Sequence, residues 1–492
     1  MSVLSHATVL LLMVLLVSGC APRPARDAGF SDVEQLVAGR TQETLHWRGI
    51  SIEEEALEAT VRELLKEELT VQQAVRVALL NNASLQAVLE ELGIGRAELV
   101  QAGLLRNPYL DASLRFPDRG SGTNLEISLV QEFLNVLSLP LRRRVAAVAF
   151  EQVKLRTADA ALTLIADVKA AFYAAQGRSQ LLESRRMVEE VAELSFDAAR
   201  RLHRAGNITD LALARHQTRF EQARVERMRA EADMESACGN LAALLGLASR
   251  EILVLAPHLP ELPPSEISYA GLEAQALAER LDLAVARLEE QRLVERLGGA
   301  RLTAIQPDIK AGVETEREIG GTWLTGPSVR ATVPLFDTGR AAVAGERGRL
   351  RQARQMVAAL EVQVRNEADQ AFRQLLAARS ETEHYRRVLL PLHGAVVDET
   401  QLQYNAMQLG IFALLEAKEE ELEAVGAYVQ SLQDYWLAHA RLARVVGGRL
   451  PEPVPPEPDE VEDLEELFKK EEPDVKPSEP VPAPSPHHDH HH

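Results

Sequence analysis

The chain has 492 residues, only 4 % of which are aromatic, and a formal net charge of −19 at pH 7. Because aromatic side chains are scarce while Ala, Leu, Glu, Arg and Gln are abundant, the composition excludes a thick aromatic core and favours long helices with slim interfaces. No face of the expected helices concentrates Lys and Arg, which excludes a nucleic-acid footprint.

The N-terminus has the pattern of a secretory signal. Residues 9–17 form an apolar run, too short to cross a bilayer, and small residues then lead to Cys20. This pattern predicts a signal peptide over residues 1–19. "LVSGC" resembles a bacterial lipobox, so Cys20 is expected to carry the lipid, with palmitate among its chains, and Ala21 implies the outer membrane. The alternative is a chance Cys in an ordinary signal sequence, since no Lys or Arg precedes the apolar run. Lipidation leaves Cys238 without a disulfide partner, as a small buried hydrophobe.

The first half of the chain alternates between helical and strand periodicity. In "YLDASLRF" and "NLEISLVQEF" apolar and polar residues alternate one by one, and the turn-rich "PDRGSGT" separates the two stretches. Strict alternation around such a turn predicts a strand hairpin. The expected elements are a helix over 70–105, strands over 109–116 and 124–133, and helices over 139–203 and 210–247.

The stretch "RAGNITDLALA", residues 204–214, separates the last two of these helices. Gly206 can adopt a positive φ and therefore suits the end of a helix. Asn207 is the expected cap of the next helix, and Asp210 stands three residues on in a capping-box-like arrangement beside the helix N-terminus. The pattern predicts a tight turn between antiparallel helices.

The second half of the chain repeats the first. Ala78 matches Ala276 and Phe133 matches Phe336, with offsets that stay between 198 and 203. An offset this steady indicates an internal duplication. In the second turn, "AMQLGIFALLEA", Gly410 is the expected helix break and no Ser, Thr or Asn cap follows it. The expected elements are a helix over 269–304, strands over 307–316 and 328–336 around a loop, a helical stretch over 338–405 interrupted at most by Pro391, and a helix over 411–446.

The expected lengths fit together within each repeat. At 1.5 Å per residue the 139–203 helix is roughly 100 Å long, about the combined length of the two shorter helices beside it. Each repeat is therefore expected to pack one long helix against two half-length helices through coiled-coil seams. Four strands per chain close into a membrane barrel only if several chains contribute.

The expected organisation is mainly helical with a small β part. Its segments are a signal peptide (1–19), a lipidated N-terminal segment (20–69), a first repeat (70–255), a Pro-rich linker (256–268), a second repeat (269–448) and an acidic, Pro-rich, disordered tail (449–492).

The order of these features resembles the outer-membrane efflux proteins of the TolC family, over about residues 70–447. The local matches are "ALLNNASL" and "ALAERLDL" at the repeat starts, "LRNPYLDAS" and "IQPDIKAG" at the first strands, and "RAGNITDLALA" and "LGIFALLEA" at the helical turns. The resemblance implies a homotrimer with a twelve-stranded β-barrel in the outer membrane above a trimeric α-helical barrel in the periplasm. It also implies a passive export conduit that docks on a periplasmic membrane-fusion adaptor and an inner-membrane pump.

The resemblance assigns roles to the two helical turns. Asp210 and Glu416 are expected to line the closed periplasmic entrance, where an acidic ring would attract cations. The alternatives are a plain helix cap for Asp210 and a solvated helix face for Glu416. The chain departs from the family at Met407, where the second turn usually has Gly, and at Ala413, which replaces an acidic residue. The residues expected to dock the adaptor are Gly206, Asn207, Leu409 and Gly410.

The tail from residue 449 has 13 acidic and four basic residues, a net charge of −9. "DEVEDLEELFKK" within it has one apolar helical face, which fits either a short docking helix or chance spacing in a disordered tail. The terminal "HHDHHH" is either a divalent-metal site or an expression tag. The candidate metal ligands are His487, His488, His490, His491 and His492.

The sequence contains no His-Glu-x-x-His, Gly-x-Ser-x-Gly or phosphate-binding loop, so it predicts neither an enzyme nor a cofactor. The leading hypothesis is an export conduit whose energy source lies in a partner. Two alternatives stay open: a non-conducting, lipid-anchored coiled-coil scaffold in the periplasm, and a metal-binding lipoprotein acting through its His-rich tail.

Overall fold

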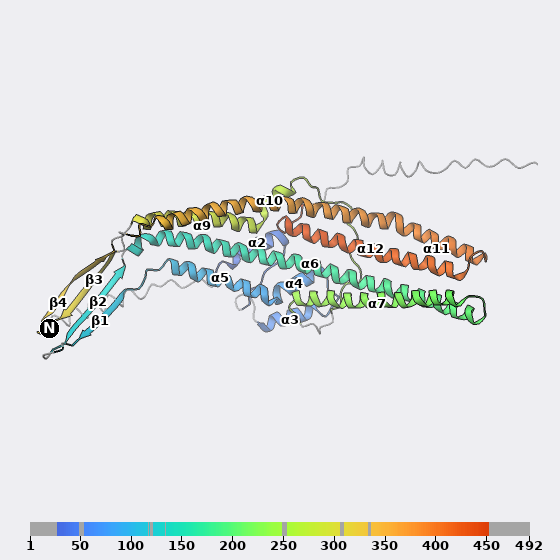
Figure 1. Cartoon of the computed structure of the whole chain (residues 1–492), viewed down its shortest axis with the longest axis horizontal. Helices are drawn as coiled ribbons and strands as arrows, with labels where there is room; N and C mark the ends of the chain where they lie inside the picture. The colour runs from blue at the N-terminus through green and yellow to red at the C-terminus, as the bar shows by residue number, and fades with distance from the viewer. Residues whose placement is uncertain are drawn as a thin grey trace, which may run out of the picture. The chain divides into compact units, whose positions relative to one another are not determined.

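The computed structural model describes residues 27–48, 54–116, 118, 122–132, 134–247, 253–305, 309–332 and 336–451. These residues form long helices and one four-stranded sheet (Figure 1), which confirms the predicted fold class. The first half contains α2 (Phe30–Thr41), α3 (Glu54–Leu64), α4 (Val71–Asn81), α5 (Ala83–Ala102), β1 (Tyr109–Arg115), β2 (Asn124–Glu132), α6 (Leu134–Arg204) and α7 (Asp210–Leu244). The second half contains α8 (Leu272–Glu279), α9 (Leu281–Ile305), β3 (Ile309–Arg317), β4 (Trp323–Ala331), α10 (Arg340–His384), the π-helical turn η1 (Tyr385–Leu389), α11 (Leu390–Asn405) and α12 (Ile411–Val445).

The element order from α4 to α7 recurs from α8 to α12, as a duplication requires. The helix predicted before each strand hairpin is broken in two, which corrects the expectation of continuous helices over 70–105 and 269–304. The breaks fall at Asn82 and Arg280, both in extended conformation. At the first break the Asn82 side chain caps α5 by accepting a hydrogen bond from the Leu85 N–H at 2.9 Å.

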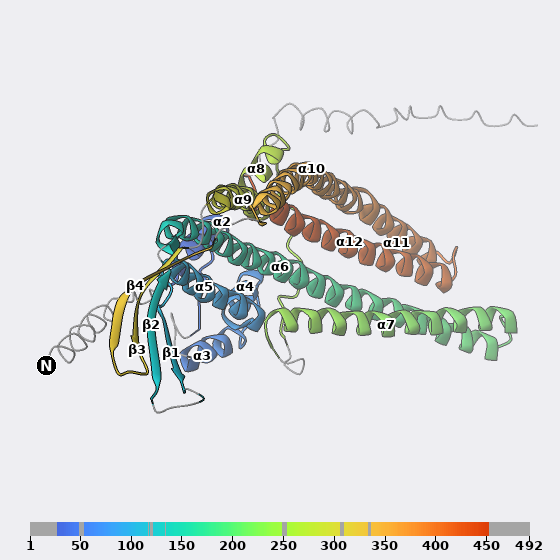
Figure 2. The same cartoon turned by 60° about the vertical axis from the view of Figure 1, so that its left-hand side comes forward.

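Helix α6 is the central element of the fold. It has 71 residues, which at 1.5 Å per residue gives a length of roughly 105 Å. It packs against α5 and α4 along its first part, against α7 in the hairpin that follows, and against α9 and α12 of the second repeat (Figures 1 and 2). The second repeat pairs α10 with α9 and α12, and α11 with α12. One long helix per repeat therefore lies beside two shorter ones, as predicted.

Small residues let α6 and α12 approach closely. A side chain on Gly177 of α6 would place its Cβ within 2.4 Å of the Gln433 side chain of α12. Seven residues further along α6, the Ser184 hydroxyl donates to the Leu422 carbonyl of α12 at 3.0 Å, beside Gly426. A slim seam of this kind needs few aromatic residues, which explains the composition.

The long helix of the second repeat is interrupted one turn earlier than predicted. The interruption is η1, which ends two residues before Pro391, and the Leu390 N–H bonds to the Tyr385 carbonyl five residues back. Proline has no N–H to donate and its ring crowds the preceding turn, so a wider turn accommodates it. Helix α6 has no such interruption at the matching place.

The four strands form one antiparallel sheet in the order β1-β2-β3-β4 (Figure 2). β4 covers Trp323–Ala331 instead of the predicted 328–336. The turn before it is tighter than expected, because the Glu318 N–H bonds to the Thr322 carbonyl at 3.0 Å and Gly321 adopts a φ of 86°. Trp323 to Gly326 therefore pair with β3 instead of forming a loop.

The two faces of the sheet differ in polarity. The register places Glu126, Glu314 and Glu316 on the same face. The opposite face is apolar and exposed in the single chain, with Leu110 72 % and Val329 73 % accessible. The apolar face carries Leu110, Leu114, Ile127, Leu129, Val313 and Val329.

The first part of the Pro-rich linker lies along the helices. Gln176 of α6 donates to the carbonyls of Ala256 at 2.8 Å and His258 at 2.6 Å. Trp436 of α12 donates from Nε1 to the Pro260 carbonyl at 2.8 Å. Residues 256–260 therefore cross the seam between α6 and α12 and link the two repeats. No helix in the described ranges is both long and apolar enough to span a membrane.

Candidate functional site at the two hairpin tips

The α6–α7 tip is a Schellman turn. Gly206 has a φ of 77°, and its N–H bonds to the His203 carbonyl at 2.9 Å, while the Asn207 N–H bonds to the Leu202 carbonyl at 2.9 Å. These two bonds satisfy carbonyls that the helix end would leave free. Gly206 therefore ends α6 as predicted.

The cap of α7 is Thr209, not Asn207 as predicted. The Thr209 Oγ1 accepts a hydrogen bond from the Ala212 N–H at 3.3 Å, with the backbone of Thr209 in the extended region. Asn207 is already used as the second residue of the Schellman turn, so the next helix begins two residues later. Asp210 is the first residue of α7 and forms no capping box.

The Asp210 carboxylate pairs with His203 across the turn, at 2.6 Å from Nε2. Its side chain is 97 % exposed. At the first position of a helix a carboxylate interacts favourably with the helix dipole. Asp210 is thus a solvent-facing negative charge at the end of the hairpin, and the cap function belongs to its neighbour.

The α11–α12 tip closes with the same pair of bonds. The Met407 N–H bonds to the Tyr404 carbonyl and the Gln408 N–H to the Gln403 carbonyl, both at 2.9 Å. The left-handed residue is Met407, with a φ of 58°, and not Gly410 as predicted. Gly410 has a φ of −84° and precedes α12 without a side-chain cap, as expected from its sequence.

The second tip is also the more apolar one. Met407 is 94 % exposed and Leu409 is 37 % exposed. A non-glycine residue at positive φ is disfavoured by contact between its Cβ and the backbone. The second tip therefore combines backbone strain with an exposed apolar side chain.

The two hairpins contact each other just behind their tips. The His216 ring of α7 stacks on Phe412 of α12, with centroids 4.2 Å apart, and Ser195 Oγ lies 3.0 Å from His216 Nδ1. One turn further, Arg219 of α7 pairs with Glu419 and Glu423 of α12. These side chains join the two repeats at the end remote from the sheet.

Electrostatics at this contact favour a neutral imidazole. Burial lowers the pKa of His216, and the nearby Glu416 carboxylate acts in the opposite direction. Burial raises the pKa of Glu419, which Arg219 opposes and the neighbouring Glu423 and Glu416 reinforce. The acidic groups of α12 are thus crowded together.

Glu416 itself is exposed on the second turn of α12. The run of acidic residues that follows is only partly a solvated face, because Lys418 pairs with Glu421 while Glu419 pairs with Arg219. The structure brings Glu416 beside the hairpin contact, whereas Asp210 lies at the turn of the first hairpin.

The remaining candidates from the sequence are the two cysteines and the histidines of the tail. Cys20 and the candidate histidine ligands of the tail (His487, His488, His490, His491 and His492) lie outside the described residues. Within the described part of the chain, no three His, Cys, Asp or Glu side chains cluster as a metal site. Cys238 is a half-buried free thiol whose Sγ lies 3.7 Å from Met234 Sδ, and burial raises its pKa.

Sequence reasoning missed Thr209, Met407 and the His216–Phe412 and Arg219 contacts. Thr209 carries a local signal, since Thr directly before an acidic first turn is a common helix start. Met407 lies 201 residues after Gly206, within the range of the repeat offsets, so an alignment of the two turns could have found it. The contacts between hairpins join residues about 200 apart and have no local signal.

Comparison with known proteins agrees with this fold. Residues 74–247 match the family model described as outer membrane efflux protein. The matched residues lie within the first repeat. The match confirms, over the first repeat, the resemblance to the outer-membrane efflux proteins of the TolC family. No curated protein matches the chain.

Several solved structures share the fold at low sequence identity. The Neisseria gonorrhoeae MtrE outer membrane channel in its open state has a TM-score of 0.64 at 20 % identity, covering 77 % of this chain and 89 % of that one. The outer membrane protein VceC from Vibrio cholerae gives 0.63 at 16 % identity, covering 77 % and 97 %. The Campylobacter jejuni CmeC outer membrane channel gives 0.61 at 15 % identity, covering 88 % and 94 %.

Proposed function

We propose that this efflux-family protein is the outer-membrane channel of a tripartite export system. It acts as a passive conduit from the periplasm to the exterior. The observation that carries the proposal is the combination of a sheet with one exposed apolar face and a duplicated set of long helices that end in two hairpin tips. Asp210 lies at the first tip, and Glu416 lies on the second turn of the helix that follows the second tip. The similar fold of solved outer membrane channels supports it.

The proposal requires several copies of the chain. β1 and β4 are the edges of the four-stranded sheet, and each offers unpaired backbone groups to a neighbouring strand. Strands cross lipid only when closed into a barrel. Pairing β4 of one copy with β1 of the next in a homotrimer would give twelve strands with the apolar faces towards lipid. Cys20 would add a lipid anchor to the same membrane.

The hairpin tips form the periplasmic entrance in this proposal. Glu416 and Asp210 are solvent-facing carboxylates, and three copies of each would surround one axis. The turns at Gly206–Asn207 and Leu409–Gly410 dock the membrane-fusion adaptor, and the exposed Met407 widens the apolar part of that surface. The inner-membrane pump supplies energy and selects the substrate.

Single-channel recording in planar bilayers tests this function. Purified full-length protein should have a trimeric mass by light scattering in detergent, and it should produce discrete conductance steps. A stable monomer, or a trimer that inserts without conducting, would overturn the channel proposal. The second of these results would favour the lipid-anchored scaffold instead.

A further inference from the structure

Arginine residues gather where the helices meet the sheet. The first fifteen residues of α10, 340–354, contain five Arg and a single acidic residue, Glu346. α6 carries three consecutive Arg at 142–144, and α9 ends close to Arg301. The chain as a whole has a net charge of −19, so these segments are a local region of positive charge.

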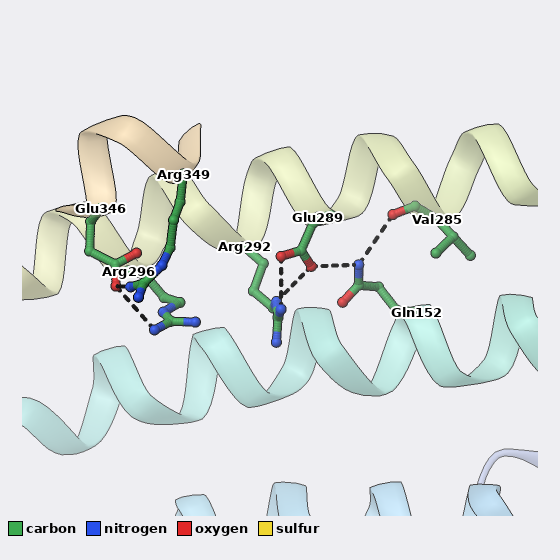
Figure 3. Close-up of polar contacts among 7 residues, drawn as sticks. All are labelled: Gln152, Val285, Glu289, Arg292, Arg296, Glu346 and Arg349. Atoms are coloured by element: carbon green, nitrogen blue, oxygen red, sulfur yellow. Dashed lines mark hydrogen bonds and ion pairs between the residues drawn. The ribbon is translucent and has the colours of Figure 1, made fainter. Parts of the chain in front are cut away.

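Some of these charges are already neutralised. The buried Glu346 carboxylate accepts Arg296 of α9 at 3.0 Å and Arg349 of α10 at 2.5 Å (Figure 3). Arg354 pairs with Glu290 at 2.8 Å, and Arg144 lies 3.7 Å from Glu295. In the same close-up, Gln152 of α6 and Arg292 both bind Glu289 of α9. These contacts hold α6, α9 and α10 together.

A second set is exposed and makes no ion pair with any described residue. We call this set the basic collar. It consists of Arg143, Arg301, Arg340, Arg347 and Arg351.

The collar lies at the base of the sheet. Arg340 is the first residue of α10, and Arg301 is four residues from the end of α9 at Ile305. At 1.5 Å per residue, Arg301, Arg347 and Arg143 lie roughly 6, 10 and 14 Å from the ends of their helices that join the strands. A headgroup layer is about 5–8 Å thick beyond the hydrocarbon core, and charge acts over about 8 Å in physiological salt.

We propose that the basic collar binds the phosphate groups of anionic phospholipids at the membrane surface below the sheet. The inference rests on the proposed function, since it needs the sheet to lie in the membrane. A guanidinium binds phosphate through two parallel N–H bonds, and its aliphatic stem can extend towards the lipid. The three helices that carry the collar are each adjacent in the chain to a strand of the sheet, and the exposed apolar face of that sheet favours a lipid over a soluble acidic partner.

This charge pattern corrects the expectation that no face concentrates Lys and Arg. The collar residues come from three segments up to about 200 residues apart, and only the packing of α6, α9 and α10 brings them to one level. A linear scan of charge shows the runs at 142–144 and 340–354 only as separate segments and does not show that they lie at one level.

Binding of fluorescent phosphatidylglycerol to the full-length protein in detergent tests the proposal. The parent should bind phosphatidylglycerol at least about tenfold more tightly than phosphatidylcholine, since each Arg near a phosphate layer contributes several-fold. The triple variant R143Q/R340Q/R347Q should lose most of this preference. The control R215Q/R224Q/R229Q removes the same charge from exposed Arg of α7 without an ion pair among the described residues, and it should keep the preference.

Three results would overturn the collar. They are a parent without preference for phosphatidylglycerol, an equal loss in the collar and control variants, and displacement of the lipid by inorganic phosphate, which would indicate a site for the free anion. Conductance of the same parent preparation separates this inference from the proposed function. Conduction without lipid preference refutes only the collar, and lipid preference without conduction refutes only the channel.

Discussion

The two hairpin tips close with the same pair of backbone hydrogen bonds but place different residues in the left-handed position. The α6–α7 tip uses Gly206, which has no Cβ to strain, and caps the next helix with Thr209. The α11–α12 tip uses Met407 and has no side-chain cap. The hairpin geometry is thus set by the packed helices, and the local residues decide how much strain it holds. The second tip is the less stable of the two and is the better placed to move.

Gly206→Ala tests the unstrained tip and should have the largest effect. A Cβ at a φ of 77° costs about 1–2 kcal/mol, although nothing lies within 4 Å of it to add a clash. Hydrogen exchange should become faster at the end of α6 and the start of α7 and stay unchanged in α12. Unchanged exchange at the first tip would mean that the left-handed turn is not maintained there.

Met407→Gly should act in the opposite direction. Glycine removes the strain of a φ of 58°, while its greater freedom in the unfolded chain offsets part of the gain, so the tip should be stabilised by about 1 kcal/mol or less. Slower exchange at residues 402–412 measures this. Met407→Ala is the matched control, because it removes the exposed apolar side chain and keeps the strain. A gain in the alanine variant as large as in the glycine variant would assign the effect to the side chain.

Thr209→Ala removes the one side-chain cap that distinguishes the tips. Loss of an N-cap costs about 1 kcal/mol, and the first turn of α7 should fray. Thr209→Ser should retain the cap and behave like the parent. Hydrogen exchange over residues 209–213 measures this. If it were no faster in the alanine variant than in the serine variant, the Thr209 cap would not distinguish the two tips.

The contact between the hairpins should depend on pH. Burial lowers the pKa of His216 below its ordinary value of 6.5 in the folded chain, so the unfolded chain binds the proton more readily. The stabilisation is therefore complete above about pH 6.5 and is lost as the pH falls towards the lowered value. Glu416 opposes the shift, so the effect is the smallest of the four. Hydrogen exchange at the start of α12, corrected for intrinsic rates, should show a loss on acidification that His216→Gln abolishes. An identical pH profile in that variant would contradict this role.

The sequence predicts which helices and strands form better than it predicts where they begin and end or which side chains they bring into contact. The long helices and the alternating strands are visible because periodicity is a local signal that the packing preserves. β4 was placed five residues too late because the tight turn at Gly321 left Trp323 to Gly326 free to pair. The break at Arg280 carries no Gly or Pro, and only its equivalence to Asn82 explains it.

The candidate site was predicted in part. Gly206 follows from its own chemistry, whereas Met407 contradicts residue preference because the flanking helices impose the turn. The contact of His216 with Phe412 and the basic collar depend on residues about 200 apart in the chain. Side-chain encounters of that kind follow from the packing of the repeats and have no signature in a single segment.

The reversal potential of reconstituted channels across a salt gradient tests most directly whether the tips form the entrance. Glu416→Gln keeps the shape of the side chain and removes three charges from the ring, so the preference for cations should fall. Asp210→Asn should change it less, since the His203 ring already contacts that carboxylate, with Nε2 2.6 Å from it. The account predicts a shift towards zero for Glu416→Gln that exceeds the shift for Asp210→Asn. If both variants kept the reversal potential of the parent channel, the account would be contradicted, because neither carboxylate would then lie along the path of the ions.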